Sequence, residues 1–288
     1  MTNLEPITHR KKAKLVLISL CVYVVWTAAT YLLEGRIHLL QRIDVFGRFE
    51  YAIVANMIIG TVAAIWLISH YHVPSKFVSA RQMGFQQVSR KFITVLVISS
   101  LLGFGLFVFQ RPASLNPIVI SNVFAQTLPV SIAEGVVCWV VVGTSFESLV
   151  LFSDKSRTML KWKNKKITHI FAIIVGAGLA TVLFGVYHFA HSPPFNQLNT
   201  VLFLMIPGAL TSVVYFIGRN IYATIIFHNF QALYGVMRNI DITSFSHLLY
   251  PLIIMASVSI LILIAADLLL VRRQIITNVT NTKNKNRS

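Results

Sequence analysis

The sequence predicts an all-α membrane protein, a polytopic bundle of about eight transmembrane helices. Three observations predict this fold. Hydrophobic residues make up 56% of the 288 residues and charged residues only 12%, whereas ordinary globular chains carry about 25% charged residues. Apolar runs of about 20 residues, the length that crosses a bilayer, recur along the chain. Lysine and arginine are abundant in alternate loops and scarce in the others.

Eight apolar segments each have about the length that one helix needs to cross a bilayer. No soluble domain, repeat or low-complexity stretch separates them, so residues 1–288 are predicted to form a single membrane domain. The polar tail over residues 278–288 is predicted to be disordered, because it has few apolar residues to bury. The segments run over residues 14–33, 51–70, 92–110, 129–152, 169–190, 198–217, 221–238 and 248–271.

The cationic residues are concentrated in alternate loops. Twenty of the 25 lysines and arginines lie in the N-terminal residues, in residues 71–91 and 153–168, at Arg219 and near the C-terminus. Because cytoplasmic loops carry the excess of Lys and Arg, both termini are predicted to face the cytoplasm, which requires an even number of spans. The other five cations are Arg36, Arg42, Arg48, Arg111 and Arg238.

The formal net charge of +16 could indicate a nucleic-acid partner. The cations are spread over the ends of apolar segments, however, so anionic lipid at the basic cytoplasmic loops is the expected partner and nucleic acid is not. Residues 34–50 carry three arginines among apolar residues and form either an amphipathic helix at the outer surface or a solvated loop. Cys21 and Cys138 lie inside apolar runs and are expected to pack between helices.

An ionisable residue inside a span is a candidate functional residue, because lipid offers it no partner. Glu134, early in the fourth segment, is the clearest of these. The alternative is a neutral glutamate that hydrogen-bonds between packed helices. Small and polar residues accompany Glu134 on one predicted helix face, namely Ser131, Gly135, Cys138 and Ser145.

His188 lies near the end of the fifth segment and shares a helix face with Phe184, four residues earlier. Pro193 and Pro194 are expected to end this helix. His191 could join a site with His188, but its place beside the prolines favours a boundary position. The predicted small or polar face comprises Thr181, Gly185, His188 and Ser192.

His228 lies within the seventh segment and is the third candidate. A single histidine in a span more often packs between helices. Three polar faces on three helices each need a partner, however, so Glu134, His188 and His228 are expected to converge on one cavity. The third face comprises Thr224, His228, Gln231 and Gly235.

Two further acids lie toward the basic ends of spans. Glu147 precedes the basic loop at 153–168, and Asp267 precedes Arg272 and Arg273. Both are expected to pair with Lys or Arg at the membrane interface.

The motifs on the fourth, fifth and seventh spans resemble those of the CAAX protease and bacteriocin-processing family, also called the Abi family, over roughly residues 90–240. The family pattern is Glu-Glu-x-x-x-Arg, then Phe-x-x-x-His, then His-x-x-x-Asn or Asp. Phe184 and His188 match the second motif fully, while Glu134 and His228 match the first residue of the other two. The departures from the pattern are Gly135 for the second Glu, Trp139 for Arg and Ala232 for Asn or Asp.

The resemblance implies peptide-bond hydrolysis within the membrane. Glu134 would activate a water as general base with the help of His188, and His228 would donate a hydrogen bond to the oxyanion. Gln231 is the predicted substitute for the missing amide, ahead of Asn229, because it lies on the His228 face and is longer. No cofactor is expected; a catalytic metal such as zinc, ligated by Glu134, His188 and His228, is the alternative.

The resemblance also implies a peptide or protein substrate, lipidated or not, and a bacterial plasma membrane. The implied physiological roles are peptide processing and bacteriocin self-immunity. Because the second Glu and the Arg are both missing, no charge is left unpaired, which suits either a divergent protease or a non-catalytic membrane protein that binds a peptide. A transporter is disfavoured, since the chain has no paired halves with broken helices. The sequence indicates no oligomeric state.

Overall fold

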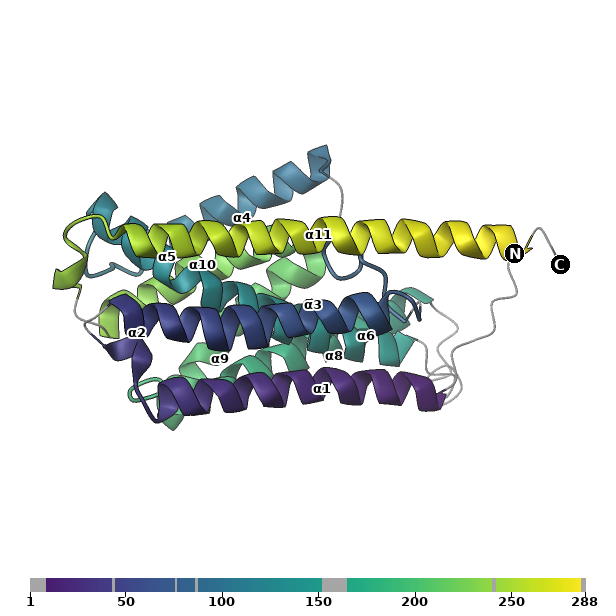
Figure 1. The fold of residues 1–288 in the computed structure, drawn as a ribbon, viewed down its shortest axis with the longest axis horizontal. Coiled ribbons are helices and arrows are strands. Elements are labelled where there is room, and N and C mark those ends of the chain that lie inside the picture. The colour runs from purple at the N-terminus through teal and green to yellow at the C-terminus, as the bar shows by residue number, and fades with distance from the viewer. Residues whose placement is uncertain are drawn as a thin grey trace.

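The computed structural model describes residues 9–42, 45–75, 77–85, 88–151, 165–239 and 242–285, which form helices and loops and include no strand. The long helices lie side by side, with the start of α1 and the end of α11 at the same end of the molecule (Figure 1). The elements are α1 (His9–Thr30), η1 (Tyr31–Gly35), η2 (Leu39–Gln41), α2 (Val45–Glu50), η3 (Tyr51–Val62), α3 (Ala63–Leu67), η4 (Ile68–His72), α4 (Arg90–Phe109), α5 (Pro117–Glu134), η5 (Gly135–Gly143), α6 (Thr144–Leu151), α8 (Lys165–Tyr187), η6 (His188–Ala190), α9 (Leu198–Gly218), α10 (Ile221–Asn239), η7 (Thr243–Phe245) and α11 (Tyr250–Lys285).

Within the part of the chain that the structure describes, seven helices, single or joined end to end, are long and apolar enough to cross a membrane. The chain is therefore an integral membrane protein, and the predicted helical bundle is confirmed. Seven of the eight predicted segments correspond to these spans. The spans are Arg10–Gly35, Phe46–His72, Arg90–Phe109, Pro117–Leu151, Lys166–Ala190, Leu198–Gly218 and Tyr250–Ile276.

The remaining predicted span, residues 221–238, forms α10 but is not among these seven. Its apolar character is interrupted by side chains that lie inside the bundle, including His228, Asn229 and Gln231, all of them buried. The helix packs against α4, α5 and α9. Because its polar side chains meet protein rather than lipid, α10 can be less apolar than a lipid-facing helix.

Two local predictions need correction. Residues 34–50 are not one amphipathic helix, because the short turns η1, η2 and α2 are separate elements. The predicted disordered tail begins too early, because α11 continues as a helix to Lys285, while residues 286–288 lie outside the described part. Residues 272–288 contain no proline or glycine that would end the helix.

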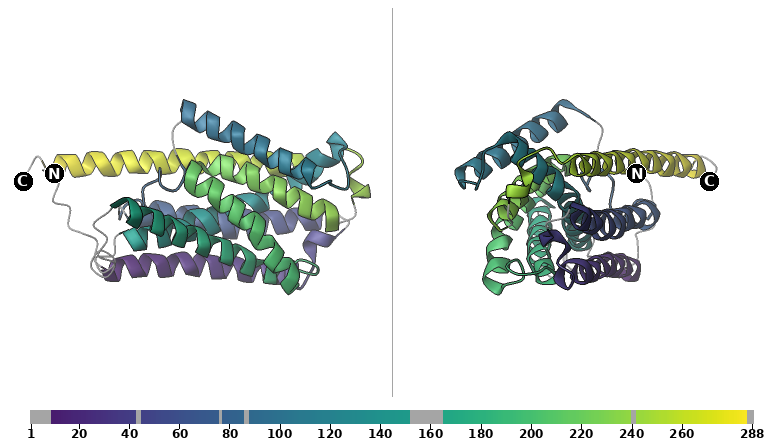
Figure 2. Two further views of the ribbon diagram at one scale, coloured as in Figure 1. Left: turned by 180° about the vertical axis from the view of Figure 1, so that it is seen from behind. Right: turned by 60° about the vertical axis from the view of Figure 1, so that its left-hand side comes forward.

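The centre of the bundle is the continuous span formed by α5, η5 and α6, whose apolar window is 94% buried. Helices α1, α8, α10 and α11 pack around it, together with η3. Every residue from Val136 to Val142 is 0% exposed. Figure 2 shows α4 inclined across the other long helices at one side of the bundle. The central span thus carries Glu134 into the interior, where only protein can satisfy it.

Four stretches within the described spans are π-helical, namely η1, η3, η4 and η5. A π-helix pairs residues five apart instead of four and is found most often at functional sites. Here η5 begins at Gly135, directly after Glu134, at the midpoint of the central span.

Candidate active site

The site is built around a hydrogen bond between α5 and α10. Nε2 of His228 lies 2.7 Å from Oε2 of Glu134, and both side chains are buried. A buried carboxylate is costly unless it is paired. The direct bond to an imidazole satisfies this need, because either the carboxylate accepts from Nε2–H or the protonated acid donates to it.

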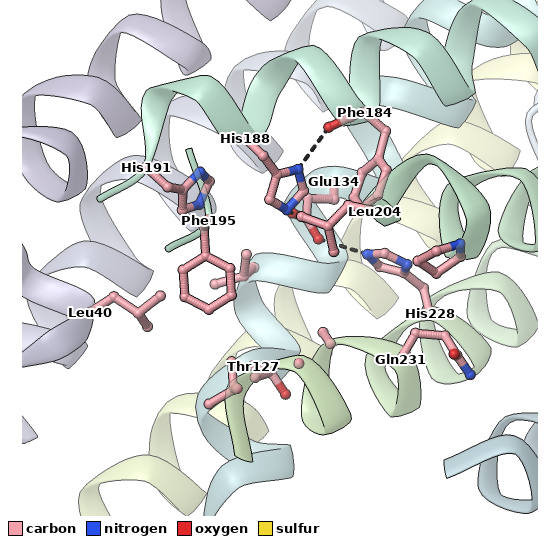
Figure 3. Close-up of a pocket in the computed structure, with 15 residues that line it drawn as sticks. Leu40, Thr127, Glu134, Phe184, His188, His191, Phe195, Leu204, His228 and Gln231 are labelled. Carbon is pink, nitrogen blue, oxygen red and sulfur yellow. Dashed lines mark hydrogen bonds and ion pairs between the residues drawn. The ribbon is translucent and has the colours of Figure 1, made fainter. Parts of the chain in front are cut away.

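His188 approaches the same carboxylate from the end of α8. Its Nδ1 lies 2.8 Å from the carbonyl oxygen of Phe184, which can only accept, so Nδ1 carries a proton. Its Nε2 therefore faces Oε1 of Glu134 at 3.9 Å. That separation is too long for a hydrogen bond but is within the reach of one bridging water. Figure 3 shows both histidines pointing toward Glu134.

Thr211 on α9 fixes the other face of His228. Its hydroxyl donates to the Pro207 carbonyl at 2.8 Å, and Nδ1 of His228 lies 3.3 Å from the same hydroxyl oxygen. Because the hydroxyl proton is already used, Nδ1 must donate to it. One further proton is then shared between Nε2 of His228 and Glu134, giving either an imidazolium–carboxylate pair or two neutral groups.

Two aromatic rings form the wall behind these groups. The Phe184 ring lies 4.7 Å from the His188 ring and 5.1 Å from the His228 ring, measured between centroids. The Trp139 ring lies 5.2 Å from that of His228, and its indole N–H donates to Ser212 at 2.8 Å. Trp139 thus packs where the family pattern has an arginine, so it restrains His228 by packing and adds no charge.

Gln231 lines the cavity one turn of α10 beyond His228 and is 8% exposed. Its Nε2 has no hydrogen-bond partner, which leaves this amide available to a bound molecule. Asn229 is fully engaged elsewhere, because it accepts from Ser131 and donates to the Phe124 carbonyl. The preference for Gln231 over Asn229 as the amide near the site is therefore supported by geometry.

A second polar cluster, which the sequence did not predict, supports the cavity at the end of α8. The ring of His191 stacks on that of His188 at 5.0 Å, and its Nε2 bonds the Tyr51 hydroxyl at 3.0 Å. Glu34 is 0% exposed and accepts hydrogen bonds from the Ser192 hydroxyl and the Leu40 amide. His191 follows the end of the span at Ala190, as the sequence predicted, and it also lines the cavity.

The sequence did not predict Glu34 as a residue near the site, because it stands at the end of the first span and is followed by Arg36 and His38. At such a place an acid usually meets water or a nearby cation. The available signal was that Glu34 is one of only nine acidic residues in the chain.

Some residues that were predicted to share a polar helix face with Glu134 or His188 have partners elsewhere in the bundle. Ser145, placed by α-helical spacing on the face of Glu134, instead bonds Ser19 and His72. Thr181, expected beside His188, bonds Ser212 on α9. The π-helical η5 changes the rotation between Glu134 and Ser145, which explains the first failure.

The two acids predicted to lie near the basic ends of spans, Glu147 and Asp267, have different kinds of partner. Glu147 pairs with Arg219, as the sequence predicted. Asp267 instead accepts a hydrogen bond from Tyr222 at 3.0 Å. The predicted pairing of Asp267 with Arg272 or Arg273 fails, because residues five or six apart on an α-helix point to different faces.

The three predicted metal ligands lie close together but at unequal separations. Glu134 and His228 touch directly, while His188 stands 3.9 Å from the carboxylate. Zinc requires its ligands at about 2.0–2.2 Å around one centre. Among the residues that the structure describes, no group of three or more His, Cys, Asp or Glu is arranged to hold a metal ion. A catalytic metal held by these three residues stays the alternative to a metal-free mechanism.

Glu134, His188 and His228 all open onto one cavity. The predicted convergence of Glu134, His188 and His228 on a single cavity is thus confirmed, and Gln231 and His191 share it. Apolar side chains form most of the remaining wall, namely Leu40, Val130, Phe184, Phe195, Leu204 and Val236. The arrangement can hold an apolar segment against a buried acid–base group.

Comparison with known families finds one match, to residues 155–234. The matching family is described as Type II CAAX prenyl endopeptidase Rce1-like. This stretch holds Phe184, His188, His228 and Gln231, while Glu134 lies outside it. No curated protein and no solved structure matches the chain. The match confirms that the chain resembles the CAAX protease and bacteriocin-processing family.

Proposed function

We propose that the protein is an intramembrane peptidase that hydrolyses a peptide bond with a water activated by Glu134. The observation that carries this proposal is the meeting of Glu134, His188 and His228, from three different helical segments, in one buried cavity. A water between Oε1 of Glu134 and Nε2 of His188 would accept or donate hydrogen bonds on both sides. Glu134 is then placed to take a proton from it.

His228 and Gln231 would stabilise the negative charge that develops during the reaction. As the water oxygen attacks the carbonyl carbon, its proton passes to Glu134 and the carbonyl oxygen becomes an oxyanion. A protonated Glu134 no longer holds Nε2–H of His228 as strongly, so that group becomes free to donate to the oxyanion. The unpartnered Nε2 of Gln231 is the second donor. Collapse breaks the C–N bond, and Glu134 returns its proton to the departing amine.

The variants that test this mechanism are Glu134→Gln, His188→Ala and their combination, assayed on candidate peptides by mass spectrometry after the membrane level of each is checked. Gln keeps shape and hydrogen bonding but cannot accept the proton, so Glu134→Gln should abolish product. The double variant should be no worse than either single one, because residues that act as a unit are non-additive. Gln231→Ala should lower the rate by about 10²–10³ if it is an oxyanion donor.

The second candidate is a non-catalytic protein that binds a peptide and confers immunity. It is favoured by Gly135 and Trp139, which replace the charged residues of the first family motif. Full biological protection by Glu134→Gln, together with no product from the wild type, would favour this candidate and exclude the peptidase.

A further inference from the structure

A second, larger cavity adjoins the active-site cavity. The two share five lining residues, so they lie side by side between α9 and α10. The shared residues are Phe195, Leu204, Pro207, Gln231 and Gly235. We name the second cavity the α9–α10 groove.

The rim of the groove is polar and comes from three helix ends. Gln110 follows the end of α4, Asn199 begins α9, and Arg238 and Asn239 end α10. The rest of its lining is largely apolar and includes Phe203, Ile206 and Leu210, which are exposed on the outside of the bundle. A polar rim over an apolar wall is what a site open to both water and the lipid edge requires.

All three helix ends lie on the side of the bundle opposite the basic loops. The connections at that side hold only five of the 25 Lys and Arg residues, and the other side holds twenty. The excess of positive charge marks the cytoplasmic side. The groove therefore faces the outer side of the membrane.

The cytoplasmic side of the cavity is closed by the central span. The residues from Val136 to Val142, which follow Glu134 toward the basic loops, are 0% exposed, and so are Thr144 and Ser145. The lining of the cavity and the groove takes no residue from this stretch. From the outer side a substrate therefore meets the groove and then the adjoining cavity, whereas from the cytoplasm it meets a packed helix.

We propose that the substrate is a peptide presented at the outer side of the membrane. The peptide reaches Glu134 through the α9–α10 groove. This inference rests on the proposed peptidase function. The inferred substrates are peptides that are exported or anchored at the outer side of the membrane. They are not the C-termini of cytoplasmic proteins. The apolar wall of Phe203, Ile206 and Leu210 would hold apolar side chains of an extended segment.

The first test uses the full-length protein in oriented membrane vesicles. The probe is a set of internally quenched peptides with apolar centres, added outside the vesicles, with Glu134→Gln as the inactive control. We expect product from right-side-out vesicles at the rate seen in detergent, and none from sealed inside-out vesicles. Product in detergent and only from inside-out vesicles would overturn the sidedness and leave the peptidase function standing. No product even in detergent would overturn both.

The second test reports the orientation of the groove without requiring activity. Asn199→Cys places a thiol at the exposed rim, and Val88→Cys is the matched control on the basic side, where Val88 is 74% exposed. The native Cys21 and Cys138 lie within spans and set the background. In intact cells a bulky membrane-impermeant maleimide should label Asn199→Cys but not Val88→Cys, and labelling should block cleavage. The opposite labelling pattern would contradict the proposal.

Discussion

At the scale of single residues, the site depends on where protons can sit. Thr211 uses its hydroxyl proton on Pro207, which obliges Nδ1 of His228 to be a donor. The Phe184 carbonyl oxygen can only accept a hydrogen bond, so Nδ1 of His188 is a donor as well. Both imidazoles therefore turn Nε2 toward Glu134, one at hydrogen-bond distance and one across a gap that a water spans.

Thr211→Val tests this positioning. The substitution keeps the side-chain shape but leaves Nδ1–H of His228 buried without an acceptor, which costs about 1–3 kcal/mol. We expect the turnover of peptide to fall by about tenfold or more, since about 1.4 kcal/mol corresponds to a factor of ten. Thr211→Ser keeps the hydroxyl and should restore most of the activity. Equal losses in both variants would show that packing, not the hydrogen bond, matters.

His191 should make the stability of the folded protein depend on pH. Burial lowers the pKa of His191 well below its ordinary value of 6.5, so the folded protein holds it neutral. The unfolded chain takes up a proton as the pH falls below 6.5 and the folded chain does not, so stability is lost in that direction. In a comparison of thermal unfolding in detergent between neutral and mildly acidic pH, His191→Gln should lose less stability than the wild type. Parallel losses would contradict this account.

The sequence predicted the central residues of the site but not their surroundings. Glu134, His188 and His228 stood out because ionisable groups within apolar runs are rare and need partners. Glu34 and Thr211 could not be found in this way. One resembles an interfacial acid and the other an ordinary helix-packing hydroxyl, and only the tertiary structure shows what they contact.

At the scale of elements, the site depends on close packing of α8 against α9. An added Cβ on Gly208 would lie 2.7 Å from Cδ1 of Phe184. The Phe184 ring has no room to move, because the rings of Trp139 and His228 lie within 5.3 Å of it. The absence of a side chain at Gly208 thus allows Phe184 to reach the two histidines.

Gly208→Ala should therefore destabilise the protein by about 1–3 kcal/mol, the usual cost of overpacking. Gly178→Ala on α8 is the matched control, because an added Cβ there meets nothing within 4 Å. It should be neutral or slightly stabilising, since Ala is the better helix former. Thermal unfolding of both variants in detergent measures the difference. A Gly208→Ala variant as stable as Gly178→Ala would show that α9 adjusts freely.

The helices themselves were largely predictable, and their internal geometry was not. Lipid requires about 20 apolar residues per span, so seven segments were found from composition alone. The π-helical η5 has no such signature, and it invalidated the α-helical spacing used to place Ser145 beside Glu134. The pairing of Asp267 with Tyr222 likewise required knowing which helix lies opposite.

At the scale of the whole molecule, charge and packing give the bundle two unlike ends. One end holds most of the Lys and Arg residues, and the other holds the groove, the rim residues and the cluster of His191 and Glu34. Glu134 lies at the midpoint of the central span, where the two ends meet. This placement gives a peptide access to the carboxylate while the helices keep the site away from bulk water.

The central claim is that Glu134 activates a water that cleaves a peptide bond, and one measurement tests it most directly. Purified wild type and Glu134→Gln are incubated with the same peptides in water enriched in heavy oxygen, and the products are weighed by mass spectrometry. The account predicts a wild-type product whose new C-terminal carboxylate carries one heavy oxygen atom, and no such product from Glu134→Gln. Equal amounts of labelled product from both proteins, or none from the wild type, would contradict it.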